Sequence, residues 1–510
     1  MYRILTASKD TYITNKIINN SFRATDANVG KAASLDLFKL FAESTSGSNT
    51  NPIEISRALL KFNLNPIRKL TGSFLDISHA SFKCVLKMYD VYGGQTTPSN
   101  FKLIVYPVSR SFDEGVGVNI VDYSDLDSCN FVTASVQGTT PSLWYHSGAN
   151  KTGLLGSSDI DIISSGNLKN GDGVVNLWKT QSFASGEEDL SIDVTTLVSA
   201  TLKDIIPDHG FRISYSGSEE TDQQTRFVKR FASTQTSNYA KRPRLVISYN
   251  DTIQDHHGVF LFNLSGSLFL NNSHRGTVSN IVSGSSLTQI TESNSLLLEL
   301  TSGSNSKGTL FQKFITASQH KMGNNYITGT YSASFAISQW ASGTLRKEIR
   351  NANSATFTEI WSSLDRTVSF LTSSLTINTV NRTSFTNSSQ RLIVNITNMQ
   401  PSYMPDDKVR FRVFVENVDR AVRYKKLPFV TKSEIFTSMY YRIRDDESNE
   451  VIVPFDTGGG TLCSTDSDGM YFDVYMDSLF KGRLYTIDFL IKDRGIDQIF
   501  TQVAAKFRVS

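Results

Sequence analysis

Apolar and polar residues alternate along most of this 510-residue chain, and this period of two constrains its fold more than any other feature. Between residues 56 and 64, one face carries Ala58, Leu60, Phe62 and Leu64, and the other carries Arg57, Leu59, Lys61 and Asn63. Successive side chains of an extended strand point to opposite sides of a sheet. The alternation therefore predicts antiparallel strands with one buried and one solvated face.

Two further segments show the same period. In residues 101–108, Leu103 and Val105 alternate with Lys102, Ile104 and Tyr106. Residues 469–477 place Met470, Phe472, Val474 and Met476 on an apolar face opposite Tyr471, Asp473, Tyr475 and Asp477. Clusters of Ser, Gly, Asn and Thr at 42–52, 164–173 and 300–308 supply the turns. Many short strands joined by polar turns predict an all-β chain built from β-sandwiches in tandem.

Helical spacing occurs in one short segment and is ambiguous in another. Residues 193–204 carry Leu197, Val198 and Leu202 at helical intervals, and Ile205 continues the spacing, with Thr195 or Thr196 as the expected N-cap. Residues 332–352 are compatible with a strand over 335–340 that runs into a turn. Helices are therefore expected to be rare.

The chain is too long for one ordinary core, and composition shifts divide it into three expected domains. The first covers residues 1–250 and contains a long polar insertion near 120–180. The second, a β-sandwich, covers 251–390 and follows a polar break at 251–258. The third covers 391–510 and has the strand content of an immunoglobulin-like sandwich, without the cysteine pair of antibody domains.

Charge and cysteine content exclude several classes of function. The formal net charge is +3, and basic residues are scattered, so no nucleic-acid partner is expected. The densest basic group, Arg423, Lys425 and Lys426, is interpreted as a solvated turn. The cysteines lie far apart without a C-x-x-C pair, which argues against a zinc site and a disulfide framework. They are Cys84, Cys129 and Cys463.

Targeting signals are not visible in the sequence. The first residues lack an apolar signal-peptide core, and no run approaches the roughly 18 apolar residues of a membrane span. We therefore expect a protein that is neither secreted by its own signal nor anchored to a membrane.

Two acidic clusters and the histidines are the candidates for catalytic or metal-binding sites. The clusters 187–189 (Glu-Glu-Asp) and 445–447 (Asp-Asp-Glu) each lie between strand-like runs, where adjacent carboxylates usually point into water. His256 and His257 point to opposite sides of an extended chain, so a linker or interface role is favoured over metal binding. No histidine forms a recognisable motif with Ser or Cys. The histidines are His79, His146, His209, His256, His257, His274 and His320. We expect no catalytic residues and therefore no enzyme.

Loop motifs offer two further alternatives. Asp466, Asp468 and Gly469 are similar to part of a calcium loop, but the full ligand pattern is absent, and Asp-Gly favours a hairpin turn. The glycine-rich segments 171–173 and 458–460 lack the Lys-Ser/Thr and helical pattern of phosphate loops and are interpreted as turns. No metal or other cofactor is predicted.

Aromatic residues leave carbohydrate binding open, because exposed rings stack on sugars. The candidates are Trp144, Tyr145, Trp178, Trp340 and Trp361. In a chain of three sandwiches these side chains are more often core or interface anchors.

Five segments of the first domain occur in a familiar order. They are 8–15 (SKDTYITN), 56–64 (SRALLKFNL), 190–202 (LSIDVTTLVSATL), 208–215 (DHGFRISY) and 242–249 (RPRLVISY). Together they resemble the DNRLRE-type domain, a jelly-roll module of bacterial and archaeal surface proteins and of phage structural proteins. The resemblance implies an N-terminal jelly roll over residues 1–250 whose last strand ends near Asn250. The insertion from Asp122 to Gly173 departs from the family.

The C-terminal segment 451–491 resembles the ends of tail or baseplate-associated proteins of tailed phages. The two resemblances imply a non-enzymatic structural protein of a tailed bacteriophage virion, located in the tail, baseplate or neck. Such a protein would assemble in the host cytoplasm with other virion proteins and with copies of itself, in a symmetric arrangement. The alternative is an adhesin-like module that recognises a glycan on the host surface.

Overall fold

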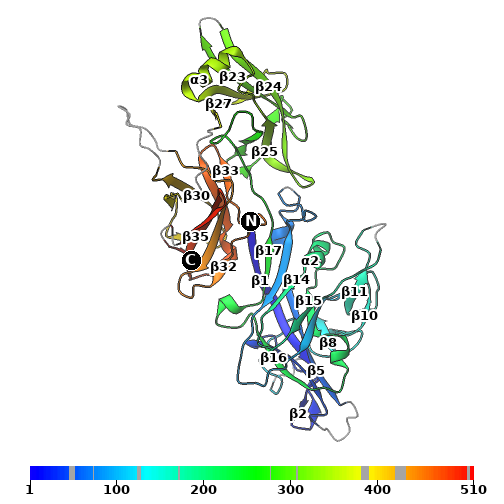
Figure 1. The fold of residues 1–510 in the computed structure, drawn as a ribbon. Helices are drawn as coiled ribbons and strands as arrows, with labels where there is room; N and C mark the ends of the chain where they lie inside the picture. Colours follow the sequence, from blue (N-terminus) through cyan, green and yellow to red (C-terminus); the bar gives the residue numbers. More distant parts are fainter. Residues whose placement is uncertain are drawn as a thin grey trace. The chain divides into compact units, whose positions relative to one another are not determined.

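The computed structural model describes residues 1–44, 52–72, 74–122, 128–169, 173–275, 277–305, 308–380, 390–419, 432–501, 503 and 506–510 (Figure 1). The chain divides into two compact units. The N-terminal unit comprises Arg3–Arg68 and Phe82–Ser248. The C-terminal unit comprises Tyr249–Ser510 together with Met1–Tyr2 and Lys69–Ser81. The expected second and third domains therefore fall within one compact unit.

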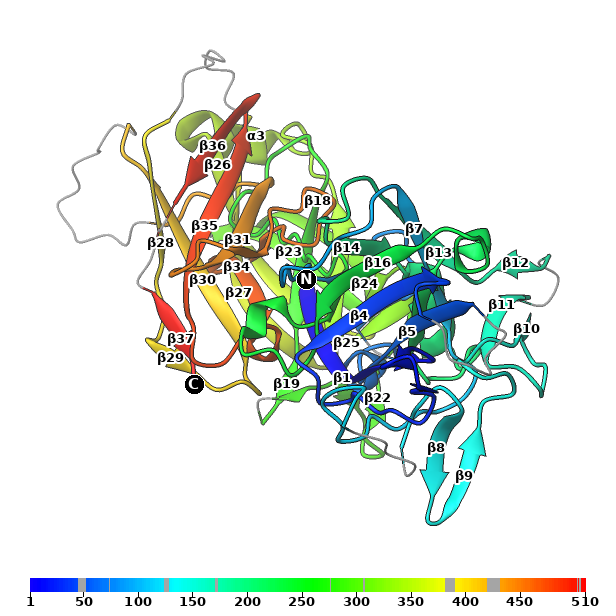
Figure 2. The ribbon, with the colours of Figure 1, turned by 90° about the horizontal axis from the view of Figure 1, so that it is seen from below.

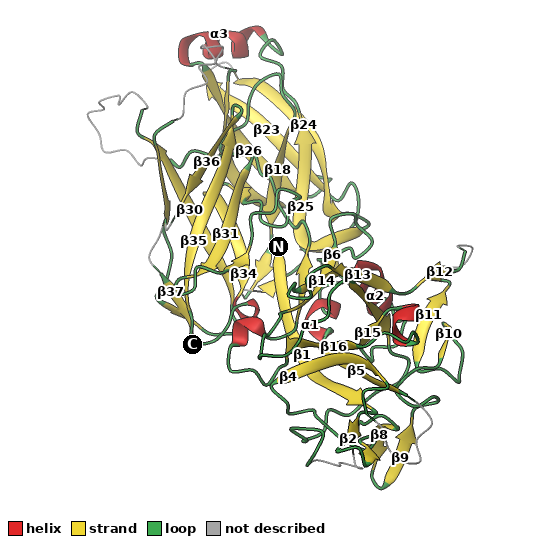
Figure 3. Ribbon diagram, turned by 60° about the horizontal axis from the view of Figure 1, so that its bottom comes forward, coloured by secondary structure: helices red, strands yellow, loops and turns green. Residues whose placement is uncertain are grey.

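The fold class expected from the alternation is confirmed. The chain is all-β, with sandwich-like sheets in tandem and few short helices (Figure 3). Among the described residues, no helix is long and apolar enough to cross a membrane.

A ten-stranded sheet system forms the N-terminal unit, in the order β13-β7-β15-β5-β1-β17-β6-β14, with β4 beside β5 and β16 beside β4. Its strands are β1 (Tyr2–Thr14), β4 (Ser34–Phe41), β5 (Ile53–Phe62), β6 (Lys83–Met88), β7 (Phe101–Pro107), β13 (Lys179–Phe183), β14 (Leu190–Asp193), β15 (Phe211–Tyr215), β16 (Arg226–Ala232) and β17 (Arg244–Ser248). Smaller elements are β2 (Ile17–Ile18), β3 (Phe22–Arg23) and the one-turn helix α1 (Asn65–Arg68). The segment 242–249 thus supplies a strand beside the first strand of the chain.

Strand β5 is buried on both faces, so the prediction of one solvated face is wrong here. Leu59, on the face expected to be polar, packs with Ile13 of β1 and with Val108, which follows β7. The cause is the segment between β7 and β13, which covers this face of the sheet. A close approach at the edge of β15 also requires Gly210, because a Cβ there would lie 2.1 Å from the carbonyl oxygen of Leu60.

The covering segment corresponds to the expected polar insertion, and its interpretation as merely polar is wrong. It contains β8 (Thr133–Gln137) paired with β9 (Thr140–Leu143), visible as a hairpin in Figure 2, and the sheet β10 (Thr152–Leu154), β11 (Ile162–Gly166) and β12 (Val175–Asn176). It contributes apolar side chains to the core that includes Leu59, namely Phe112, Cys129, Ala134, Trp144 and Ala149. The insertion is therefore an integral layer of the unit.

The expected helix at 193–204 is present as α2 (Thr195–Leu202), with Leu197, Val198 and Leu202 buried. The expected threonine N-cap is wrong, because Thr195 is already helical. The hydroxyl oxygen of Thr195 instead accepts from the backbone N–H of Cys84 (2.8 Å), and Asp193 Oδ1 accepts from the backbone N–H of Thr195 (2.8 Å). The helix is thereby tied to β6.

The first part of the C-terminal unit is a six-stranded antiparallel sheet in the order β18-β25-β24-β23-β26-β27. Its strands are β18 (Gly266–Asn271), β23 (Leu296–Asn305), β24 (Gly308–Met322), β25 (Asn325–Phe335), β26 (Ser354–Ser362) and β27 (Ser369–Asn378). Two small hairpins accompany it: β19 (Ser273–His274) with β20 (Thr277–Val278), and β21 (Val282–Ser283) with β22 (Thr288–Gln289).

The prediction of a strand over 335–340 is wrong. Strand β25 ends at Phe335, a loop follows, and helix α3 (Gly343–Ala352) begins after Ser342, whose side chain accepts from the backbone N–H of Leu345. The helix packs its buried Leu345 and Ile349 into the core of the six-stranded sheet. Two residue types typical of helix ends mark this helix in the sequence. Ser342 is its N-cap, and Asn353, which has a left-handed backbone, is its C-cap.

Two sheets form the remainder of the C-terminal unit. One has the order β28-β30-β34-β33, and the other β29-β37-β35-β31-β32, with β36 paired to β35. The strands are β28 (Leu392–Ile396), β29 (Ser402–Tyr403), β30 (Lys408–Asn417), β31 (Met439–Asp445), β32 (Val451–Val453), β33 (Ser464–Asp466), β34 (Gly469–Tyr475), β35 (Leu484–Asp493), β36 (Ile496–Phe500) and β37 (Phe507–Val509). Aromatic rings pack between the sheets: Phe411, Phe472, Phe489 and Phe507. The segment following Asn250 runs beside β33, with Gln254 bridged to Thr465.

Candidate functional site

The acidic cluster at 187–189 forms a turn. The Glu188 carboxylate accepts hydrogen bonds from the backbone N–H groups of Ala184, Ser185 and Gly186 at 2.7–2.9 Å. Burial by itself would raise the pKa of Glu188, but the backbone N–H donors together outweigh it and lower this pKa to about 2. A carboxylate held ionised in this way stabilises the turn and is a poor general acid.

The cluster at 445–447 has a similar role. Asp445 is buried and accepts from the backbone N–H groups of Glu447 and Ser448, while Arg483 lies 3.2 Å from its second oxygen. Asp446 pairs with Lys506. Asp445 thus organises the turn between β31 and β32, while the Glu447 side chain is exposed.

The segment that is similar to a calcium loop forms the predicted hairpin. Asp466 of β33 is paired with Gly469 of β34, and Ser467 and Asp468 make the turn. Both carboxylate oxygens of Asp466 lie within 2.7 Å of Arg412 Nη1. A guanidinium therefore occupies the position that a calcium ion would need.

His257 faces Glu359. Its Nδ1 lies 3.4 Å from Glu359 Oε2, and its Nε2 lies 3.1 Å from the carbonyl oxygen of Ser374. The backbone N–H of His257 donates to the buried Asp255, whose pKa is raised to about 7 by burial, with a smaller contribution from Glu359. Within the described residues, no group of three His, Cys, Asp or Glu side chains could hold a metal ion. His257 therefore serves as a polar contact between the segment after Asn250 and the six-stranded sheet.

The remaining loop candidates and the cysteines have structural surroundings. Residues 458–460 form a turn in which Asp456 accepts from the backbone N–H of Gly458. Most of the segment 171–173 and the basic group 423–426 lie outside the described residues. The three cysteines are buried and free.

The aromatic candidates divide into two groups. Trp144 and Trp361 are buried core residues, and their indole N–H groups donate to the carbonyl oxygen of Asn130 and to Glu359. Tyr145, Trp178 and Trp340 are exposed. The Tyr145 ring carries the Arg110 guanidinium 4.1 Å from its centre, and the Trp340 ring carries that of Arg346 at 4.2 Å. The rings of Tyr145 and Trp340 therefore each have one face covered by an arginine of the same chain.

A cavity of about 650 Å³ lies within the C-terminal unit. This volume falls within the usual range of small-molecule sites. One wall is formed by residues of β30 and β34, and the opposite wall by residues from β18 to β20 and from β24 and β25. The lining also includes Met1, Phe74, Tyr249, Asp251 and Ile253. We refer to this cavity as the inter-sheet cavity.

The β30–β34 wall consists of three cross-strand pairs: Lys408 with Tyr475, Arg410 with Asp473, and Arg412 with Tyr471. Of these residues, Arg412 is not among those that line the cavity. Asp473 forms a bidentate ion pair with Arg410 (2.8 and 3.1 Å) and lies 3.2 Å from Lys408 Nζ. The Arg410 guanidinium also stacks 3.9 Å from the centre of the Tyr471 ring. We call the residues of these pairs that line the cavity the charged ladder: Lys408, Arg410, Tyr471, Asp473 and Tyr475.

Electrostatics keep the charged ladder ionised. Burial alone would lower the pKa of Lys408 and of Arg410, but the Asp473 carboxylate outweighs burial and raises both. Burial would conversely raise the pKa of Asp473, and the two cations lower it. The wall therefore carries two positive charges against one negative charge.

The opposite wall combines polar residues with the apolar Val278, Met322 and Ile327, and its described lining residues include no Asp, Glu, Lys or Arg. Asn271, Ser273 and Thr277 are exposed on it. His320 lies on the same wall against the ring of Phe269, and burial lowers its pKa below the ordinary value. Amide and hydroxyl groups thus line the same cavity as the cations of the charged ladder.

The alternation at 469–477 predicted that Tyr471, Asp473 and Tyr475 share a face. It did not show that this face lines a cavity, and Lys408 and Arg410 were not singled out. The signal that could have found them is the run Lys-Val-Arg-Phe-Arg at 408–412, in which three cations alternate with apolar residues.

No family model matches the sequence, and no curated protein is similar to it. Among solved structures, the crystal structure of Salmonella alpha-2-macroglobulin reacted with methylamine aligns with 99% of this chain at 8% sequence identity and a TM-score of 0.15. The chain spans 40% of the length of that structure. A likeness at this TM-score carries no argument about fold or function.

Proposed function

We propose that the chain is a non-enzymatic structural component of a tailed-phage virion, in the tail, baseplate or neck, and that it acts through protein–protein contacts. Its partners would be other virion proteins and further copies of itself, and its final location would be the virion. The observation that carries the proposal is the outer strand of the six-stranded sheet, β27.

Strand β27 is the last in its sheet, is ten residues long and contains neither a charged residue nor a proline. Natural proteins usually protect such edges with lysine, proline or a bulge, because an open edge pairs with other chains. The carboxyl-terminal end of β27 is covered, since Asn378 bridges to Leu261 and the Ser374 carbonyl meets His257. The sheet order places no strand of the described chain beside the amino-terminal part, 369–373.

Exposed apolar side chains gather at the open part of this edge. Leu364, Val368 and Leu371 are exposed in the turn before β27 and at its start. Phe314 of β24 is also exposed, and the Arg366 guanidinium lies 4.7 Å from its ring centre, which joins that ring to the same turn. Apolar and aromatic anchors with arginine beside an open strand edge are the composition of a protein interface.

Mass spectrometry of purified phage particles tests this function. Peptide counts should be scaled to the major capsid and tail-tube proteins of the same particles. The expected result is a fixed multiplicity of about six or twelve chains per particle, as for a symmetric ring. Absence of the chain from particles would contradict the proposal.

A second candidate function is a carbohydrate-binding module that recognises a host surface glycan. The inter-sheet cavity favours it, because amides, hydroxyls, tyrosine rings and cations line one cavity of suitable volume. A glycan array probed with the full chain tests this function separately: binding to any class of cell-surface saccharide supports it, and binding to none contradicts it. Virion location and glycan binding are compatible.

A further inference from the structure

We propose that the inter-sheet cavity binds a saccharide that carries a single carboxylate, with the carboxylate held by Lys408 and Arg410. This inference rests on the second proposed function, glycan binding, and specifies its ligand class and site.

The charged ladder retains unused donors toward the cavity. Lys408 Nζ has three N–H donors, and Asp473 is its one hydrogen-bonding or ion-pair partner among the described residues. Arg410 uses Nε and Nη2 for Asp473, and its Nη1 makes no hydrogen bond within the described part of the chain. The Lys408 and Arg410 side chains are 49% and 45% exposed, so a ligand can reach both.

The balance of charge selects a monoanion. Asp473 neutralises one of the two cations of the ladder. Elsewhere in the lining, the α-amino group of Met1 lies 2.9 Å from Asp251, so these two charges also cancel. One net positive charge remains, which suits a carboxylate better than a phosphate monoester, whose charge at neutral pH approaches two.

The rest of the lining suits the hydroxyl groups and ring faces of a sugar. Asn271, Ser273 and Thr277 present exposed amide and hydroxyl groups on the wall opposite the ladder. Half-buried Tyr475 and exposed Phe74 supply rings against which apolar sugar faces can stack. A carboxylate-bearing sugar would therefore span the cavity, with its anion on the ladder and its hydroxyls on the opposite wall.

Calorimetric titration of the full chain tests the site. The probes are a disaccharide that contains one glucuronic acid and the disaccharide in which glucose replaces it. We expect the acidic probe to bind at least tenfold more tightly and Lys408→Gln to weaken it by roughly tenfold or more, because a charge-assisted hydrogen bond is lost. Lys481→Gln, which removes an exposed lysine that does not line the cavity, is the matched control and should leave affinity unchanged.

A second variant tests the opposite wall without changing charge. Thr277→Trp places a bulky side chain at an exposed position of the cavity lining and should abolish binding of the acidic probe. Equal affinities of the wild type, K408Q and T277W would overturn the site, while glycan binding as a function would survive. Failure of the acidic probe to bind would also overturn the inference, and the glycan array would then decide independently whether the chain binds any saccharide.

Discussion

The N-terminal unit and the charged ladder use cationic side chains in opposite ways. In the N-terminal unit, Lys39 and Lys229 are both 0% exposed, and each ammonium group meets several acceptors. Lys229 donates to Asp90 Oδ1 (2.5 Å) and to the carbonyl oxygens of Gly186 (2.7 Å) and Glu188 (2.9 Å). In the ladder, by contrast, Lys408 is half-exposed and meets one carboxylate.

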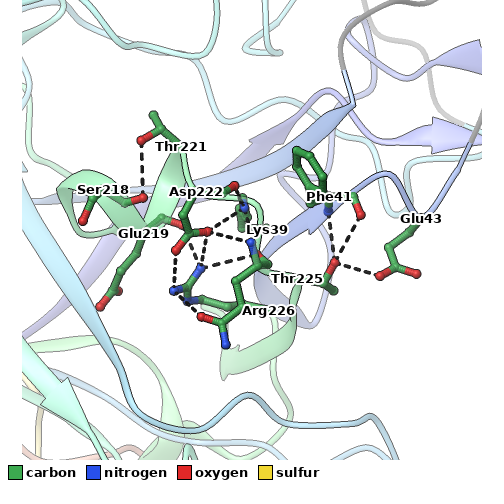
Figure 4. Close-up of polar contacts among 10 residues, drawn as sticks. Lys39, Phe41, Glu43, Ser218, Glu219, Thr221, Asp222, Thr225 and Arg226 are labelled. Carbon is green, nitrogen blue, oxygen red and sulfur yellow. Dashed lines mark hydrogen bonds and ion pairs between the residues drawn. The ribbon is translucent and has the colours of Figure 1, made fainter.

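The second buried lysine shows the same arrangement (Figure 4). Lys39 Nζ donates to both the side chain and the backbone carbonyl of Asp222, and to the carbonyl oxygen of Gln224. Arg226 forms a bidentate pair with the same carboxylate, and these hydrogen bonds lower the pKa of Asp222. The cluster fixes the loop before β16 onto β4.

The difference follows from desolvation. A buried ion is tolerated only where hydrogen bonds replace its lost hydration, and three acceptors match the three donors of an ammonium group. Such a charge is fully used by the fold. A half-exposed cation remains hydrated, costs the fold little and keeps donors for a ligand.

The largest expected loss of stability is that of Lys229→Met, and its absence would break this comparison. The substitution keeps a long apolar stem but leaves Asp90 and two carbonyl oxygens without their donor. We expect the free energy of unfolding of the N-terminal unit to fall by about 3–5 kcal/mol, the usual cost of removing one partner of a buried ion pair. Urea titration read by hydrogen exchange of peptides from 82–248 measures it.

Lys102→Met is the control, because Lys102 is exposed on β7 of the same unit. It should change the free energy of unfolding by no more than about 0.5 kcal/mol. If both variants lose the same small amount of stability, the buried ammonium of Lys229 does not anchor the fold, and the contrast with the ladder fails.

The second prediction concerns the pH dependence of stability. It compares a buried carboxyl group of the N-terminal unit, Asp10, with Asp473 of the charged ladder. Burial raises the pKa of Asp10 to about 6, although the backbone N–H and the hydroxyl of Thr234 donate to it at 2.7 and 2.5 Å. The folded state therefore holds this proton more tightly than the unfolded state, in which the pKa is near 3.8. The contribution of Asp10 to stability must fall as pH rises from about 4 to about 6, and level off above.

The steepest slope from one such group is about 1.4 kcal/mol per pH unit. Urea titrations at several pH values should show this slope in the difference between the wild type and Asp10→Asn. Asp473→Asn serves as the comparison. The difference in free energy of unfolding between the wild type and this variant should change with pH in the opposite direction, because the pKa of Asp473 is lowered in the folded state. A pH-independent difference for D10N would contradict the raised pKa.

Much of the secondary structure could be predicted from the sequence, because the period of two reports each strand directly. The alternation located β5, β7 and β34, and helical spacing located α2. What the sequence did not show was which elements cover a face. The polar-looking face of β5 is buried because Phe112 and Trp144, far along the chain, pack over it. Helix α3 was not predicted, because the pattern at 335–340 was compatible with a strand that runs into a turn.

The candidate site could be predicted only in part, for the same reason. The polar face of β34 was evident, since Tyr471, Asp473 and Tyr475 alternate with apolar residues. Its neighbour β30 lies some sixty residues earlier, and the opposite wall comes from a different sheet. A cavity depends on how sheets pack, and local periodicity carries no information on that packing.

The smallest expected effect is that of Asp473→Asn in the charged ladder at neutral pH. The change removes the carboxylate shared by Lys408 and Arg410, yet both cations are about half-exposed and stay hydrated. We therefore expect a loss of only about 1 kcal/mol in the free energy of unfolding of the C-terminal unit, measured by urea titration. A loss as large as that of K229M would show that the ladder is a structural anchor like the buried lysines. A loss near 1 kcal/mol, by contrast, supports a ladder whose charges remain available to a ligand, because the fold does not depend on their pairing.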